Sequence, residues 1–81
     1  MTLKDLTEQM IHFGYLYQLP EPKVEYLEEV HKEITIRKWT DAQFIDALDY
    51  LKGDIEYSRT SRYNKYPTIC DLLRANYDLQ N

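Results

Sequence analysis

Trp39-Thr40-Asp41-Ala42-Gln43-Phe44 is the most informative stretch of this 81-residue sequence. Thr40 and Gln43 have the spacing of a capping box, in which each side chain bonds the backbone N–H of the other residue. Trp39 and Phe44 occupy the two positions of a hydrophobic staple, an apolar pair that fixes how the chain enters a helix. The stretch therefore predicts a helix over residues 41–56, with an apolar stripe of Phe44, Ile45, Leu48, Leu51 and Ile55.

Two helices are predicted before this stretch. The first covers residues 3–18, with Thr2 as its N-cap and an apolar face of Leu3, Leu6, Met10, Phe13 and Tyr17. Leu-Pro-Glu-Pro at 19–22 stops it, because proline has no amide hydrogen and restricts the residue before it. The second covers residues 22–35, with Pro22 among its first residues. Its apolar face is Val24, Leu27, Val30 and Ile34, and β-branched residues at 34–36 give it a weak end.

A short last helix is predicted over residues 69–77, after a basic, tyrosine-rich loop at 57–67. Thr68 caps this helix and Asp71 completes a second capping box, while Ile69, Leu72 and Leu73 face inward. The sequence contains no convincing strand and no internal repeat. The expected fold is all-α, a small compact bundle of about four short helices that forms a single domain over residues 1–81.

The composition limits the class of protein. With 43% hydrophobic and 30% charged residues the chain can form a packed core. It has no apolar run near the roughly 18–20 residues of a membrane span and no signal-peptide pattern, so we expect a cytoplasmic protein with no membrane partner, in the host cytoplasm if phage-encoded. Cys70 is the single cysteine, so an internal disulfide is excluded and a buried or half-buried thiol is expected.

The charges divide the chain into an acidic body and one short basic segment. The net charge is −4, which opposes general nucleic-acid binding. Residues 1–51 hold five basic and ten acidic side chains, whereas residues 52–81 hold five basic and four acidic ones. Between Tyr57 and Tyr66 there are three cations and no acid.

Nothing in the sequence indicates an enzyme, a cofactor or a metal site. His12 and His31 are the only histidines, each on a predicted helix, with no serine or cysteine nearby. There is no glycine-rich phosphate loop, and the spacing of His31 to the glutamates around it does not match that of metal ligands on a helix. A solvated acidic helix face is the better interpretation of these glutamates.

The candidate site residues are therefore partner-binding ones. They are Glu25, Glu28 and Glu29 on the acidic second helix and Arg59, Arg62, Tyr63 and Lys65 in the basic loop. Tyr63 lies among the cations without an evident core role, whereas Tyr17, Tyr50 and Tyr66 fit packing. Three interpretations of the loop stay open: a solvated connector, a protein-docking site and a nucleic-acid contact.

Asn64-Lys65-Tyr66-Pro67-Thr68-Ile69-Cys70-Asp71-Leu72-Leu73 resembles the aromatic–Pro–Thr–Ile–x–Asp–Leu/Ile–Leu ending of the bacteriophage replicative-helicase loader/inhibitor family. The order of elements before it is similar too, so the pattern covers about residues 3–75. The resemblance implies a small, acidic, all-helical phage protein that binds a hexameric helicase. Such a protein bridges the helicase to an origin-binding protein and holds it inactive until delivery.

The expected function is that of a small phage or mobile-element protein that acts by stoichiometric protein binding and gates a replicative helicase or its loader. One alternative is an anti-CRISPR or other host-factor inhibitor, whose acidic helices at 21–34 and 41–56 imitate nucleic-acid phosphates to block a nucleic-acid-processing partner such as a CRISPR effector. A second alternative is a weak DNA-binding module that uses the loop at 57–66, although the net charge disfavours direct nucleic-acid binding.

Overall fold

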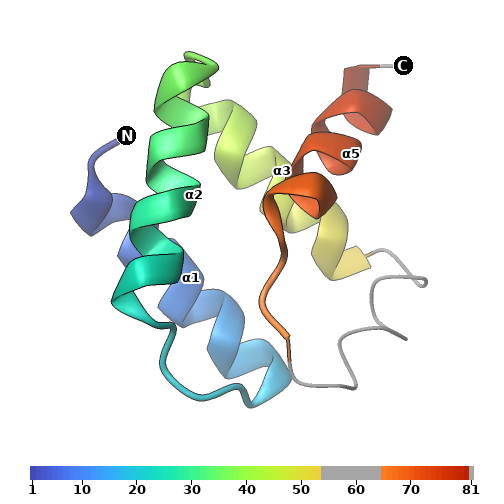
Figure 1. Cartoon of the computed structure of the whole chain (residues 1–81). Helices are drawn as coiled ribbons and strands as arrows, with labels where there is room; N and C mark the ends of the chain where they lie inside the picture. The colour runs from blue at the N-terminus through green and yellow to red at the C-terminus, as the bar shows by residue number, and fades with distance from the viewer. Residues whose placement is uncertain (54–64, 81) are drawn as a thin grey trace.

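The described part of the chain forms four α-helices, and the all-α prediction is confirmed (Figure 1). The computed structural model describes residues 1–53 and 65–80, and there is no β-strand in these two ranges. The helices are α1 (Leu3–Tyr17), α2 (Val24–Ile36), α3 (Asp41–Gly53) and α5 (Ile69–Gln80). The closest helix pairs are α3 with α5 and α1 with α2. None of the described helices combines the length and the apolar character that a bilayer crossing requires.

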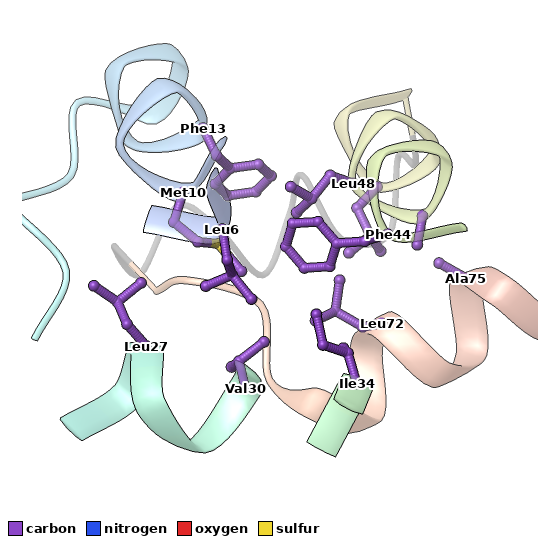
Figure 2. Close-up of a cluster of buried hydrophobic side chains, with 12 residues drawn as sticks. Leu6, Met10, Phe13, Leu27, Val30, Ile34, Phe44, Leu48, Leu72 and Ala75 are labelled. Carbon is purple, nitrogen blue, oxygen red and sulfur yellow. The ribbon is translucent and has the colours of Figure 1, made fainter. Parts of the chain in front are cut away.

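One hydrophobic core joins all four helices. In Figure 2, Phe13 of α1 and Phe44 of α3 point toward each other across its centre. The core side chains are at most 5% exposed, and burial of each large one contributes about 1.5–3 kcal/mol. They are Leu6, Met10, Phe13, Leu27, Val30, Ile34, Phe44, Ala47, Leu48, Leu51, Leu72 and Ala75.

The turn between α2 and α3 stops one helix and starts the next. Lys38 adopts a left-handed conformation with φ of 57°. The Trp39 N–H donates to the Ile34 carbonyl at 3.0 Å and the Lys38 N–H to the Thr35 carbonyl at 3.1 Å, which together form a Schellman motif. This backbone geometry, rather than the β-branched residues before it, ends α2.

The capping box that begins α3 is confirmed. The Thr40 N–H donates to Gln43 Oε1 at 2.8 Å, and the Gln43 N–H donates to Thr40 Oγ1 at 3.2 Å. Trp39 is half-buried and packs against the core cluster to which Phe44 belongs. Trp39 is therefore the apolar residue of two motifs, the Schellman motif that ends α2 and the hydrophobic staple that begins α3. Sharing one side chain between the two motifs fixes the angle between the helices.

The predicted box at the start of α5 is confirmed as well. The Asp71 N–H donates to Thr68 Oγ1 at 3.2 Å, and the Thr68 N–H donates to Asp71 Oδ2 at 3.0 Å. α5 continues to Gln80 rather than ending at residue 77. Its last turn is tied to α3, because the Tyr50 hydroxyl donates to Asp78 Oδ2 at 3.2 Å.

The connection between α1 and α2 departs from the prediction. α1 ends at Tyr17 because Gln18 is left-handed, with φ of 56°. α2 begins at Val24 rather than residue 22, since Lys23 before it is still extended. Val24 was predicted to face the core, and this is wrong: its side chain is 60% exposed. The predicted end of α3, residues 54–56 with Ile55, lies outside the described residues.

We expect Thr40→Ala to lower the free energy of unfolding by about 1 kcal/mol, because it leaves the Gln43 N–H without its side-chain acceptor. Urea denaturation followed by circular dichroism measures the change. Thr40→Ser, which keeps the hydroxyl, is the matched control and retains most of the stability. Equal losses in the two variants would contradict a role for the box in starting α3.

Candidate functional site

Three carboxylates lie on the solvent side of α2. Glu25, Glu28 and Glu29 are exposed, and we call them the acidic face. The opposite side of the helix is buried in the core. Among the described residues none of the three forms an ion pair, and the i,i+4 spacing of Glu28 and Lys32 does not produce one. No ion pair among the described residues therefore neutralises the three negative charges, and the helix that carries them is packed into the core on its other side.

Of the candidate loop residues, the structure describes Lys65 alone. Arg59, Arg62 and Tyr63 lie outside the described residues. Lys65 is exposed and begins the segment 65–68, which leads into α5 and is orange in Figure 1. The three interpretations of the loop therefore stay predictions, and the following geometry concerns its last residues only.

Segment 65–68 is held against α2 and the connection 18–23 by two tyrosine hydroxyls. The Tyr26 hydroxyl donates to the Pro67 carbonyl at 2.6 Å, and the Tyr66 hydroxyl donates to the Pro20 carbonyl at 2.5 Å. The rings of Tyr26 and Tyr66 also pack together, with centroids 5.7 Å apart. Pro67 is fully buried. The entrance to α5 is thus fixed by contacts with parts of the chain far away in sequence.

Gly14 makes room for this arrangement. A Cβ at Gly14 would overlap the Tyr66 hydroxyl and lie 3.2 Å from its Cζ, so a larger residue would displace the ring. Burial raises the pKa of Tyr66, and the negative charge of Glu21 raises that pKa further. The hydroxyl therefore stays protonated and able to donate throughout the neutral range.

Two cavities formed by described residues border segment 65–68, and both have Tyr26 and Thr68 in their walls. The first, of about 330 Å³, lies against the connection 18–23. The charged residues in its walls are Glu21, Lys23 and Lys65. The second, of about 270 Å³, lies against the middle of α2. Its walls are Tyr26, Glu29, Val30, Glu33, Thr68 and Ile69. Glu29 and Lys65, from the two halves of the predicted site, thus line neighbouring cavities.

The histidine of α2 has a structural partner. His31 Nε2 lies 2.9 Å from the Met1 carbonyl oxygen, an acceptor, so this nitrogen donates the hydrogen bond. The Met1 ammonium group lies 3.0 Å from Asp41 Oδ1. Together the two contacts attach the start of the chain to α2 and to the first turn of α3.

Cys70 is exposed, so the prediction of a buried or half-buried thiol is wrong. Its neighbour Ile69 packs against the core from the first turn of α5, which turns the next side chain outward. Within residues 1–53 and 65–80, no group of three or more His, Cys, Asp or Glu side chains is arranged to hold a metal ion.

The packing roles predicted for three tyrosines are confirmed, since Tyr17, Tyr50 and Tyr66 all pack against the core. Sequence reasoning missed Tyr26 and Gly14. A signal for Tyr26 was present, because Tyr26, Val30 and Ile34 follow one another at intervals of four residues on one helix face. No comparable local signal marks Gly14, whose contact lies on another segment.

Comparison of the chain with protein families, with curated protein sequences and with solved structures gives no significant match. The resemblance to the helicase loader family therefore stays a prediction, based on the sequence pattern at residues 64–73 and on the order of the elements before it.

We expect Gly14→Ala to destabilise the fold more when the Tyr66 hydroxyl is present than when it is absent. Alanine favours the helix by about 1 kcal/mol relative to glycine, but overpacking costs about 1–3 kcal/mol. A double-mutant cycle with Tyr66→Phe separates the two effects by urea denaturation. In the Tyr66→Phe background the Gly14→Ala loss shrinks, because the nearest atom is gone. An identical loss in both backgrounds would contradict the close approach.

Proposed function

We propose that the protein acts by stoichiometric binding of another protein, and that this partner is a replicative helicase or its loader. The observation that carries the protein-binding part is the acidic face, three exposed carboxylates without ion pairs beside a cavity on the same helix. The choice of a helicase or loader follows from the resemblance at residues 64–73.

The acidic face suits a stoichiometric binder for two physical reasons. A surface on a helix that is packed into the core loses little conformational freedom when a partner binds. The loss of conformational entropy therefore offsets less of the favourable binding energy. Charges of one sign attract a positively charged partner surface and orient it during approach. An occupied surface on the helicase or loader is then no longer free for assembly on DNA.

A second candidate function uses the same face. Exposed carboxylates along a helix also imitate the phosphates of a nucleic-acid strand, as in the inhibitor alternative. The partner would then be an enzyme or effector whose nucleic-acid channel is basic. The two candidates differ in one measurable property, because only the inhibitor competes directly with nucleic acid for its partner.

We expect the triple variant Glu25→Lys/Glu28→Lys/Glu29→Lys to lose partner binding, because it replaces attraction by repulsion. Isothermal titration against the purified helicase and against its loader measures the loss. Binding by the unmodified protein weakens with added salt, since exposed charges are screened beyond about 8–10 Å at physiological ionic strength.

The matched control is Asp5→Lys/Glu8→Lys/Asp46→Lys, which changes three exposed acids on α1 and α3 and gives the same net charge. It keeps its affinity if the position of the charges matters, whereas equal losses in both triple variants would mean that only net charge acts. Full binding by a folded acidic-face variant would overturn the proposed function. Competition with DNA for the same partner would favour the inhibitor candidate.

A further inference from the structure

We propose that the 270 Å³ cavity beside the acidic face receives one apolar side chain from a basic segment of the partner protein. This inference rests on the proposed function and specifies the chemistry of its partner. The cavity is called the anchor cavity below.

The walls of the anchor cavity favour an apolar occupant. Tyr26, Val30 and Ile69 supply ring and aliphatic surface from α2 and from the first turn of α5. Its volume of about 270 Å³ is slightly below the roughly 300–1,000 Å³ of sites that enclose a whole small molecule. That size suits a single side chain of a docked segment, which is how most binding energy is concentrated at protein interfaces.

The charge around the anchor cavity favours a basic segment. Glu29 lines the cavity and belongs to the acidic face, so Glu25 and Glu28 extend the negative surface beyond it. Glu33 also lines the cavity and is bound to Arg37, which leaves Glu29 as the rim carboxylate without an ion pair among the described residues. A segment with Lys or Arg beside its apolar residue matches this pattern.

The same charges argue against other occupants. The neighbouring cavity has two cations, Lys23 and Lys65, and one carboxylate, Glu21, in its walls, so this excess of positive charge attracts an acidic segment there rather than to Glu29. A second copy of this chain has a basic segment between Tyr57 and Tyr66 but a net charge of −4, and that net charge opposes its approach to the acidic face. The two cavities that share Tyr26 and Thr68 therefore differ in the charge that they select.

Two small probes test this selection directly. Tryptamine carries an indole ring and an ammonium group, whereas indole-3-acetate carries the same ring and a carboxylate. In methyl NMR spectra of the full chain we expect tryptamine to shift the Ile69 and Val30 methyl signals saturably. Indole-3-acetate leaves these signals in place. Equal shifts with both probes, or none with tryptamine, would overturn the proposal.

Substitutions then locate the tryptamine site. Glu29→Gln weakens tryptamine binding about two- to fivefold, the range expected for one exposed charge pair. Asp46→Asn removes an equally exposed charge from α3 and leaves the affinity unchanged. Equal affinities in the Glu29→Gln and Asp46→Asn variants would show that tryptamine does not bind at Glu29, against the proposal.

Partner binding separates this inference from the proposed function. Glu29→Trp and Glu28→Trp each remove one charge of the acidic face, but only position 29 lines the anchor cavity. We therefore expect the new ring to occupy the cavity in Glu29→Trp alone. We expect Glu29→Trp to lose at least tenfold more affinity than Glu28→Trp in titrations with the helicase or loader. Similar losses of affinity in Glu29→Trp and Glu28→Trp would overturn the anchor cavity but not binding through the acidic face. The proposed function itself would be overturned if the triple lysine variant of the acidic face bound the partner with unchanged affinity.

Discussion

The hydrogen bond from the Tyr26 hydroxyl to the Pro67 carbonyl holds the entrance to α5 against α2. Pro67 is fully buried, and a buried carbonyl that lacks a partner destabilises a fold by about 1–3 kcal/mol. Tyr26 provides that partner from α2 at 2.6 Å. Because Tyr26 also forms a wall of both cavities, the bond that satisfies the backbone simultaneously shapes the surface between α2 and α5.

The parts of the fold that the sequence predicts correctly depend on residues close together in the chain. Each capping box joins residues three apart, so Thr40 with Gln43 and Thr68 with Asp71 can be recognised without any knowledge of tertiary structure. Val24 fails for the opposite reason. Its spacing places it on the apolar face of α2, but the positions of the other helices decide which part of that face is covered.

The candidate site divides in the same way. The acidic face is predictable, since three glutamates on a helix whose other side is apolar must face solvent. The two cavities are not predictable, because their walls combine α2 with segment 65–68 and, in one case, with the connection 18–23. Contacts between segments so far apart leave no residue spacing that a short window of sequence could reveal. Gly14 is the clearest example, because only its distant neighbour Tyr66 explains it.

The long sequence separation of the two tyrosine hydrogen bonds has a consequence for the order of folding. They join residues 41 and 46 positions apart, whereas the helix caps close locally. Because closing a long loop costs entropy, we expect segment 65–68 to dock late in folding and to detach early in partial unfolding. Loss of this docking would remove the wall that Thr68 gives to both cavities and leave the walls that α2 supplies. Occupation of the proposed anchor cavity would therefore report on the docking of segment 65–68 against α2.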